Sequence, residues 1–378
     1  MPSDRSAPFI VGFVYDGEPF DAQTWSGCSR FFFEALARQG CLRAAFGAKV
    51  GRAETLALRA LTFHPDLAKW KFRAGGNVAR ASLRTRDGLR KLATLDADSY
   101  DTILQFGAFY DFTRRPGKRT VSYNDTNLQS MVTAYPERAD LRSSLTRSLL
   151  RYESQVFENT DVLFTMSRWC ADTFVRDLGI DAAKVEPIGA GMNLAEMPDV
   201  SEKRYDEANI LFVGRDFARK GGHVLLQAFE GVRRALPHAT LTLIGAKDLH
   251  ELPDGVDDLG FVSKRSEAGI ARINAAYARA SVFVLPSIWE PFGISVLEAQ
   301  AYGLPCVGTE VGALPELITE ADAGLVVPRN DAASLAAALL RMLRDPVMCA
   351  QMGSNGRRRQ QEYYTWDGVA RRIRERLT

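Results

Sequence analysis

Short apolar runs alternate with amphipathic helical patterns along the chain. In the first half, the apolar runs lie at 8–16, 41–47, 101–107, 119–123 and 161–167. Each is bounded by turn-forming residues, which is typical of a buried strand. Helical spacing covers 28–40, with Gly40 at the expected stop, and 137–159. Strand–helix alternation of this kind predicts a parallel sheet covered on both faces by helices.

The alternation restarts after a segment rich in Gly, Pro and charge at 189–208. Further strands are expected at 209–214, 239–245, 256–262, 281–287 and 305–309, with helices at 220–236, 266–279 and 293–303. We therefore predict two facing Rossmann-like α/β domains, 1–192 and 200–362, the first completed by a closing helix at 364–378. Ligands of open parallel sheets bind at the carboxyl ends of the strands, which places the site in the cleft between the two domains.

Composition narrows the class of protein. The chain has 378 residues, 46% of them apolar and 25% charged, as in ordinary globular proteins. No stretch approaches the ~20 apolar residues of a membrane span, and the N-terminus shows no secretion signal. The five cysteines are scattered and form no CxxC pair, so we expect reduced thiols, a cytoplasmic protein and no zinc site.

Charge is unevenly distributed along the chain. The net charge is +2, yet residues 30–91 hold fourteen Lys and Arg against four Asp and Glu, a net +10. This region is either the solvated face of ordinary helices or a contact with an anionic partner, such as the inner membrane surface. No nucleic-acid-binding signature accompanies it, so nucleic acid is not an expected partner.

The segment 285–317 holds the strongest chemical signal. Glu290 follows an expected strand, and Glu298 lies on the helix that begins at Phe292, Gly293 and Ile294. A helix N-terminus offers free N–H groups to a diphosphate, and glycine lets the backbone approach it closely. Glu298 is then placed to accept hydrogen bonds from a ribose, and Glu290 to reach a sugar carried on the diphosphate.

A second cluster lies at 212–229. Arg215 and Lys220 occupy the loop between a strand and a helix, and Gly214 opens the turn. Both cations would converge on the same diphosphate, Arg as a planar fork and Lys as a point charge. Positive charge arranged in this way would stabilise the leaving diphosphate without a metal or any other cofactor.

Together, VGRDFARKGG (213–222), the Glu290–Glu298 segment and SRWCADTFVRDLGIDAAKVEPIGAG (167–191) resemble the retaining glycosyltransferases of family 4, which have the GT-B fold. The resemblance extends to TWSGCSRFFFEALARQG (24–40), which looks like the first glycine loop and helix of that family. It implies transfer of a sugar from a nucleotide diphosphate sugar, UDP- or GDP-linked, to an acceptor hydroxyl with retention at the anomeric carbon.

The resemblance also implies roles for individual residues. Arg215 and Lys220 would bind the diphosphate, Glu298 the ribose, and Glu290 the hydroxyls of the donor sugar. The remaining contacts would come from backbone: Gly27 from the N-terminal domain, Val262 to the base, and Phe292, Gly293 and Ile294 to the sugar or phosphates. The C-terminal helix would return to the N-terminal domain, with Trp366 as a packing anchor.

One departure from the family concerns a histidine that many relatives carry after a middle N-terminal strand. The chain has His64, His223, His238 and His250, and none fits that position. The corresponding stretch, 121–130, offers Asn124 and Asp125 instead. Asp125 would orient an acceptor or sugar hydroxyl, or would cap the helix that starts near 127.

Two other functions compete with the transferase. A non-catalytic nucleotide-sugar sensor or subunit could share the fold. An NAD(P)-dependent oxidoreductase would need a complete glycine fingerprint, which the sequence lacks. The acceptor is left open between a glycan, a lipid-linked glycan and a small molecule.

Overall fold

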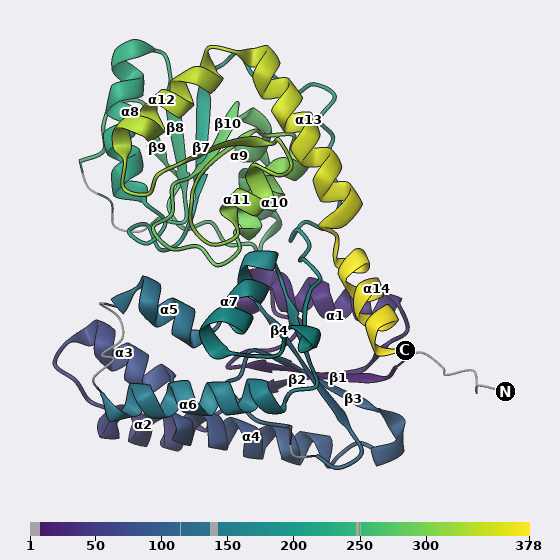
Figure 1. Ribbon diagram of the computed structural model, residues 1–378. Coiled ribbons are helices and arrows are strands. Elements are labelled where there is room, and N and C mark those ends of the chain that lie inside the picture. The colour runs from purple at the N-terminus through teal and green to yellow at the C-terminus, as the bar shows by residue number, and fades with distance from the viewer. Residues whose placement is uncertain (1–7, 114, 137–142, 247–248, 250) are drawn as a thin grey trace. The chain divides into compact units, whose positions relative to one another are not determined.

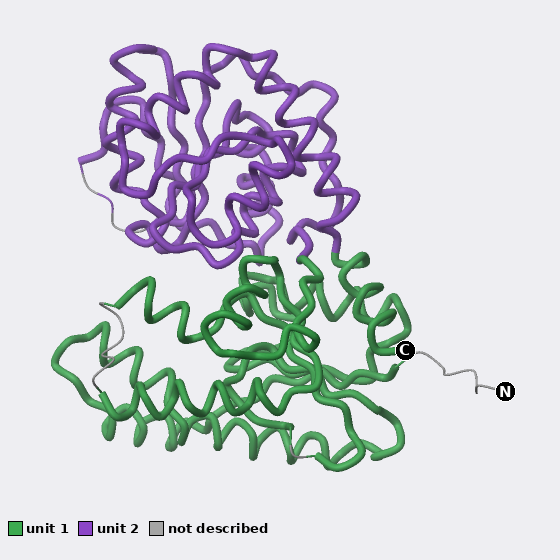
Figure 2. Tube along the Cα trace, viewed as in Figure 1, with its two compact units in different colours: residues 1–189, 366–378 green, residues 190–365 purple. Residues whose placement is uncertain are grey.

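The computed structural model describes residues 8–113, 115–136, 143–246, 249 and 251–378. The chain divides into two compact units, 1–189 with 366–378 and 190–365 (Figure 2). We call them unit 1 and unit 2. The sequence analysis placed the corresponding boundaries at 192, 200, 362 and 364.

Unit 1 is built on a six-stranded sheet in the order β2-β1-β3-β4-β5-β6, with every pairing parallel (Figure 1). Its strands are β1 (Ile10–Tyr15), β2 (Leu42–Ala48), β3 (Thr102–Phe106), β4 (Arg119–Asn124), β5 (Val162–Thr165) and β6 (Val185–Pro187). Its helices are α1 (Cys28–Arg38), α2 (Arg52–Leu61), α3 (Leu67–Gly75), α4 (Val78–Leu92), α5 (Leu128–Ala134), α6 (Ser144–Asn159), α7 (Arg168–Leu178) and α14 (Trp366–Leu377). The chain passes from β1 to β2 on one side and returns to β3 on the other, so the topological switch point lies between β1 and β3.

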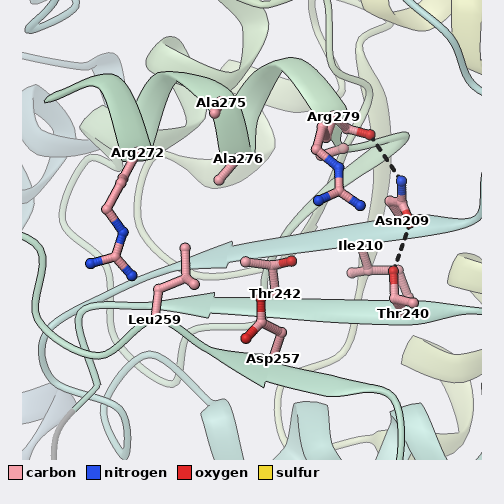
Figure 3. A pocket seen from close by; sticks show the side chains of 11 residues that line it. Asn209, Ile210, Thr240, Thr242, Asp257, Leu259, Arg272, Ala275, Ala276 and Arg279 are labelled. Carbon is pink, nitrogen blue, oxygen red and sulfur yellow. Dashed lines mark hydrogen bonds between the residues drawn. The ribbon is translucent and has the colours of Figure 1, made fainter. Parts of the chain in front are cut away.

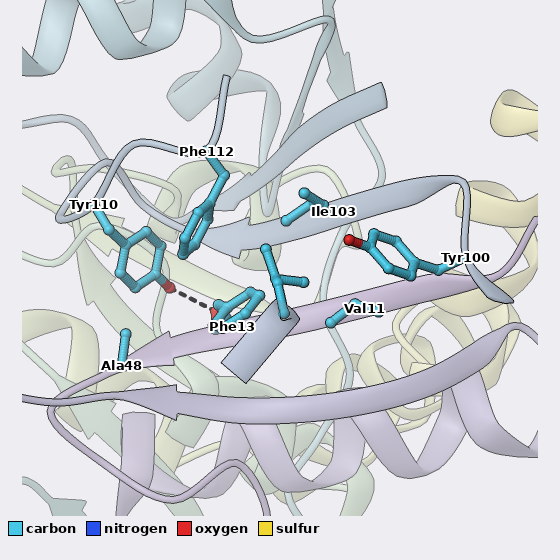
Figure 4. Packing of buried hydrophobic residues seen from close by; sticks show 8 residues of the cluster. Val11, Phe13, Ala48, Tyr100, Ile103, Tyr110 and Phe112 are labelled. Atoms are coloured by element: carbon cyan, nitrogen blue, oxygen red, sulfur yellow. Dashed lines mark hydrogen bonds between the residues drawn. The ribbon is translucent and has the colours of Figure 1, made fainter. Parts of the chain in front are cut away.

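The two faces of this sheet have separate cores, as the two-residue period of β1 requires. On one face Phe13 packs against Tyr110 and Phe112, and the Tyr110 hydroxyl donates to the Phe13 carbonyl at 2.6 Å (Figure 4). The other face is covered by α1. There a Cβ on Gly12 would lie 2.1 Å from the Phe33 ring, so glycine is needed for the helix to approach the strand.

The C-terminal helix α14 packs on α1 and is grouped with unit 1, the domain to which the sequence analysis assigned its closing helix. Trp366 is buried, and its ring centroid lies 6.0 Å from that of Phe32 and 6.4 Å from that of Tyr123. Arg372 donates to the carbonyl of Ile188 at 2.8 Å. Trp366 is therefore the packing anchor that the sequence predicted.

Unit 2 repeats the architecture, with a parallel sheet in the order β12-β11-β10-β7-β8-β9. Its strands are β7 (Asn209–Val213), β8 (Thr240–Ile244), β9 (Val256–Asp258), β10 (Val282–Leu285), β11 (Cys306–Thr309) and β12 (Gly324–Val327). Its helices are α8 (Gly222–Ala235), α9 (Glu267–Arg279), α10 (Ile294–Ala301), α11 (Leu314–Ile318), α12 (Ala332–Leu343) and α13 (Pro346–Tyr363). Here the chain passes from β7 to β8 on one side and returns to β10 on the other. The switch point therefore lies between β7 and β10.

Two expected elements differ from those observed. The strand expected over 256–262 ends at Asp258, because Gly260 adopts a φ of +61° and its N–H bonds the Asp258 carboxylate at 2.8 Å, which forms a turn. The helix expected over 137–159 is described from Ser144, and 137–142 lie outside the described residues. In the described part of the chain, no helix combines the length and apolar character that crossing a bilayer requires.

Candidate functional site

The loops that follow β7 and β10 meet at the switch point of unit 2. The Ile288 N–H donates to the carbonyl of Arg219 at 2.9 Å, which ties the two loops together. Gly221, at a φ of +74°, lies so close to Pro286 that a Cβ would sit 1.8 Å from the proline carbonyl oxygen. Any other residue at 221 would push the loops apart, so the sequence must place glycine there.

Glu290 is the centre of this junction. Its carboxylate is buried, with Oε2 2.9 Å from Nζ of Lys220 and 3.3 Å from the hydroxyl of Ser287. Arg219 adds a second cation, with Nη1 3.7 Å from the same oxygen. Within the described residues these contacts all fall on Oε2, and Oε1 accepts no hydrogen bond. Glu290 lies in the loop between β10 and α10, as the sequence analysis expected, and its carboxylate is held by residues of the β7 loop.

The charge state of Glu290 follows from these neighbours. Burial by itself would raise the pKa of its carboxyl, but the charges of Lys220 and Arg219 and the bonds from Lys220 and Ser287 outweigh burial. The pKa lies below its usual range, so Glu290 is ionised at neutral pH. A buried carboxylate with a lysine partner and a second acceptor oxygen is suited to binding hydroxyl groups.

The start of α10 lies immediately beyond Glu290. Gly293 is the N-cap, at a φ of +106° that favours glycine, and Ile294 is the first residue of the helix. No side chain caps this end, and the Val296 N–H donates to the carbonyl of Gly293 at 2.9 Å, so the N–H groups that could serve a ligand are those before Val296. Phe292 is buried and packs edge-on against Tyr364, with ring centroids 6.2 Å apart. The side chain of Phe292 is therefore engaged in packing.

Glu298 lies one turn into α10 and is also buried. Its Oε1 accepts from Nζ of Lys264 at 2.6 Å, and its Oε2 accepts from the hydroxyl of Tyr277 at 3.2 Å. The Tyr277 ring stacks on Tyr302 with an interplanar angle of 9°, which fixes the hydroxyl donor. Sequence reasoning identified Glu298 but missed Lys264 and Tyr277, which lie 34 and 21 residues away in the chain.

The other predicted residues of unit 2 lie in the loops at the same edge of the sheet. Gly214 follows β7, and a Cβ there would lie 2.4 Å from the Lys220 side chain. The guanidinium of Arg215 is exposed and lies over the ring of Phe261, 5.2 Å from its centroid. Val262, in the segment after β9, is almost fully buried. Two of the residues that the sequence analysis selected, Lys220 and Glu290, form a hydrogen-bonded ion pair.

In unit 1, Gly27 ends a strained turn after β1. It is the N-cap of α1 at a φ of +91°, and the two residues before it, Trp25 and Ser26, also have positive φ values. Left-handed non-glycine residues cost about 1–3 kcal/mol each and are enriched at functional sites. The ring of Trp25 packs against Tyr15 and Phe106, with centroids 5.6 and 5.0 Å away, which holds the turn in place.

Asp125 follows β4 at the carboxyl edge of the same sheet and is half-buried. It does not cap the next helix, since the N-cap of α5 is Asn127, which accepts from the Ser130 N–H. After burial, the charge of Asp125 is the largest influence that raises the pKa of Tyr15, at the end of β1. Asp125 therefore lies near the switch point of unit 1.

Glu153 holds the loop between β4 and α5 in place. It lies on α6, is buried, and accepts from the N–H of Leu128 at 2.8 Å. Burial raises its pKa to about 8, partly offset by that hydrogen bond. Nothing in the sequence marks Glu153, because its position in an amphipathic helix is that of an ordinary polar residue.

Three of the four histidines, His64, His223 and His238, lie within the described residues. His223, on α8, is exposed and packs edge-on against Phe217, His238 is exposed, and the ring of His64 accepts from the Asp66 N–H. His250 lies outside the described residues. Among the residues that the structure describes, no three His, Cys, Asp or Glu side chains cluster as metal ligands would.

A separate pocket of about 180 Å³ lies between α9 and the sheet of unit 2 (Figure 3). It is lined by Asn209 and Thr240, the first residues of β7 and β8, and so belongs to the opposite end of the strands from Glu290. The Thr240 hydroxyl donates to Asn209, whose amide donates to the carbonyl of Arg279. These bonds hold α9 to the strand ends, and the pocket is distinct from the glutamate site.

Comparison with known proteins assigns a chemistry to this arrangement. Residues 195–359 match the model of the family described as "Glycosyl transferases group 1". The chain is 27% identical over 325 residues to the glycogen synthase of Mycobacterium tuberculosis, covering 82% of this chain and 75% of that protein.

Solved structures show the same fold. Sucrose-phosphate synthase from Thermosynechococcus elongatus superposes with a TM-score of 0.70 at 21% identity, over 98% of both chains. Anabaena HepE, solved in complex with UDP and glucose, gives a TM-score of 0.65 at 18% identity, over 98% of this chain and 99% of its own. The chain is therefore a glycosyltransferase with the GT-B fold.

Proposed function

We propose that the protein transfers a sugar from a nucleotide diphosphate sugar, UDP- or GDP-linked, to an acceptor hydroxyl, with retention at the anomeric carbon and without a metal ion. The observation that carries this proposal is the buried Lys220–Glu290 pair beside the uncapped start of α10. It puts a cation, an anion and free N–H groups within one glycine-lined junction at the switch point of unit 2.

The diphosphate of the donor would bind between Lys220, Arg215 and the first N–H groups of α10. A helix N-terminus carries partial positive charge, and the exposed guanidinium of Arg215 can add a bidentate contact. Arg219, which the sequence analysis did not single out, adds charge to the same junction. This fixed positive charge would stabilise the diphosphate as it leaves, which is why we propose that no metal is needed.

The rest of the donor would extend along α10 in both directions. Glu298, oriented by Lys264 and Tyr277, would accept hydrogen bonds from the ribose, and the main chain at Val262 would contact the base. Glu290 would use Oε1 to hold a hydroxyl of the sugar. Main-chain N–H groups at Phe292, Gly293 and Ile294 would then position the sugar or phosphates.

Unit 1 would supply the acceptor side. Its strained turn at Gly27 would approach the donor, and Asp125 would orient the acceptor hydroxyl or a hydroxyl of the transferred sugar. The acceptor oxygen would form its bond to the anomeric carbon on the face from which the diphosphate departs. The bond to the diphosphate oxygen breaks, and the proton of the acceptor hydroxyl passes to the leaving diphosphate.

The similarities support this assignment of the donor. HepE was crystallised in complex with UDP and glucose, and the M. tuberculosis relative is a glycogen synthase by name.

A donor panel followed by a product analysis tests the proposal. UDP-, GDP- and ADP-sugars are compared by the shift that each causes in the melting temperature, and the best donor is then incubated with and without acceptor. We expect slow donor hydrolysis without acceptor, transfer with it, an unchanged rate in EDTA, and a product whose anomeric configuration by NMR equals that of the donor.

Each contrary result removes a defined part of the proposal. Binding without hydrolysis or transfer would indicate the sensor instead of an enzyme. Inversion of the anomeric centre would exclude the retaining mechanism, and loss of activity in EDTA would exclude metal independence.

A further inference from the structure

Helix α2 contacts the rest of unit 1 through one narrow stripe. From Arg52 to Thr62, the residues that are not exposed are Thr55, Leu58 and Thr62. Their spacing of three and four residues places them on a single face of the helix. The remaining circumference of α2 faces solvent.

The outward face of α2 is apolar. Ala53, Leu56, Ala57 and Ala60 are all exposed, and they follow the i, i+3, i+4, i+7 spacing of an amphipathic helix. At about 100° per residue, these positions lie about 180° from the stripe that contacts the protein. A surface helix of a globular protein normally turns such a face inward, so α2 has the reverse orientation.

The apolar face continues into the start of α3. Leu61, Phe63 and Leu67 are 82%, 67% and 56% exposed, and Leu56 is 66% exposed. We call these four side chains the hairpin surface. Among the described residues, Val347 is the one other large apolar side chain exposed by more than half. Concentration of exposed apolar side chains in one place marks an interaction site.

An aromatic pair stiffens this surface. The rings of Phe63 and Trp70 pack edge-on with centroids 5.9 Å apart, and the indole N–H of Trp70 donates to the carbonyl of Arg59 at 2.9 Å. The bond joins α3 to α2, which lie at the edge of unit 1 (Figure 1). The exposed side chains are therefore held in place by the fold.

Cations surround the hairpin surface. Arg52, Arg59, Lys69 and Lys71 make no ion pair with any described residue. By contrast, several other cations of the basic region 30–91 are paired within the protein: Arg30 with Glu34, Arg38 with Asp367, Lys49 with Glu18, Arg80 and Arg84 with Asp16, and Lys91 with Asp87. Arg43 and Arg90 also make no ion pair with a described residue, so four of the six such cations of this region lie on α2 and α3.

We propose that α2 and the start of α3 dock the protein on the surface of a bilayer that contains anionic lipids. Leu56, Leu61, Phe63 and Leu67 would enter the boundary between headgroups and acyl chains, while the four cations contact lipid phosphates. Apolar side chains with an aromatic pair and flanking Lys and Arg are the combination that interfacial helices use. A second copy of this chain fits less well, because a two-fold contact would bring the same cations together.

Vesicle flotation of the full-length protein tests the proposal. The vesicles contain either phosphatidylcholine alone or phosphatidylcholine with about 30% phosphatidylglycerol. We expect binding to the anionic vesicles, weakened when salt rises from about 0.05 M to about 0.5 M. The double variant Leu61→Ser/Phe63→Ser should lose binding by about tenfold or more.

Val347→Ser is the matched control, since it removes an equally exposed apolar side chain that lies on α13 and outside the cationic hairpin. It should float as the unmodified protein does. A second pair of substitutions, Arg52→Gln/Arg59→Gln, should weaken binding to anionic vesicles. The binding that is left should depend less on salt than that of the unmodified protein. All of these positions are exposed, and unchanged melting temperatures and unchanged nucleoside diphosphate binding confirm folding.

Three results would overturn the proposal. The first is failure of the unmodified protein to bind anionic vesicles, and the second is equal binding by the Leu61→Ser/Phe63→Ser variant. The third is a dimer by light scattering that this variant dissociates, since it would assign the surface to self-association. Vesicle binding is measured without donor or acceptor, so its outcome is independent of the proposed transferase activity.

Discussion

Different types of residue lie at the switch points of the two sheets. In unit 2, the loops after β7 and β10 carry glycines at close approaches, and two glutamates, Glu290 in a loop and Glu298 on α10, are each bound by a lysine. In unit 1, the edge at β1 carries a strained turn, a cluster of aromatic rings and one clamped carboxylate, Asp16. The two sheets have the same architecture, but the edge of unit 2 carries lysine–glutamate ion pairs and the edge of unit 1 carries packed aromatic side chains.

The difference teaches which edge a charged ligand can enter. Lys220 and Lys264 sit on flexible stems whose ammonium groups can turn from a glutamate to a phosphate or hydroxyl. In unit 1, the guanidinium of Arg84 is enclosed by the rings of Tyr15 and Phe109, at 5.4 and 5.6 Å, and binds Asp16. We infer that unit 2 binds the donor. The ion pair between Arg84 and Asp16 in unit 1 would instead stabilise the fold.

The largest expected effect follows Glu290→Gln. This substitution keeps the size of the side chain but removes the charge that would hold the donor sugar. We expect transfer to fall by about 10²-fold or more, while nucleoside diphosphate affinity changes by less than about threefold. Steady-state kinetics and calorimetry measure the two quantities. Glu267→Gln, an exposed glutamate in the first turn of α9, is the control, and a Glu290→Gln enzyme as active as that control would contradict the assignment.

Lys220→Met should act on binding and folding together. Loss of a charged hydrogen bond, about 1.5–3 kcal/mol, should weaken nucleoside diphosphate binding by about tenfold to a hundredfold. The variant should also be less stable to urea, because Glu290 stays buried with Arg219 as its remaining cation. The double variant Lys220→Met/Glu290→Gln should regain stability but not affinity. Recovery of both, or unchanged affinity in Lys220→Met, would remove the phosphate role.

Arg84→Met tests the other side of the comparison. The Arg84 side chain is 2% exposed, and its Nε lies 3.1 Å from Asp16, so its loss should cost about 2 kcal/mol in urea unfolding. Nucleoside diphosphate affinity should stay unchanged. Arg86→Met is the matched control, since Arg86 is 57% exposed and 3.8 Å from Glu54, and should cost less than about 0.5 kcal/mol. A loss of nucleotide affinity in Arg84→Met would show that unit 1 shares the donor site.

The smallest effect concerns Glu153 and pH. Its pKa is raised to about 8 in the folded protein, so the folded state holds a proton that the unfolded state releases above about pH 4.5. This contribution to stability is complete at low pH and is lost as pH rises through 8. Glu153→Gln should therefore be more stable than the unmodified protein at pH 8.5, by about 1–2 kcal/mol, and closer to it at pH 5.5. Urea unfolding at both pH values measures this difference. The same difference in unfolding free energy at pH 5.5 and pH 8.5 would contradict the assignment.

Sequence reasoning identified residues whose roles depend on local pattern. The strands β1, β3, β4 and β7 were predicted because buried apolar runs end at turn-forming residues. The short strands β6 and β12, at the edges of the two sheets, were missed. Glu290 and Glu298 were selected as candidates because they lie on one loop and the helix that follows it.

The partners of those residues could not be found in the same way. Lys264 and Tyr277 reach Glu298 from another loop and another helix, so their proximity depends on how the sheet is assembled. The reversed orientation of α2 was equally hidden, because a helical pattern predicts an apolar face but not which way that face turns. The sequence suggested an anionic partner from the charge of 30–91 and could not separate paired cations from available ones.

The central claim is that the donor diphosphate binds at the carboxyl edge of unit 2. Its most direct test is a crystal structure with the nucleoside diphosphate that stabilises the protein most. We predict a phosphate oxygen within hydrogen-bonding distance of Nζ of Lys220 and of the first N–H groups of α10, with the ribose hydroxyls on Glu298. A nucleotide bound elsewhere, with the Lys220–Glu290 and Lys264–Glu298 pairs undisturbed, would contradict the account.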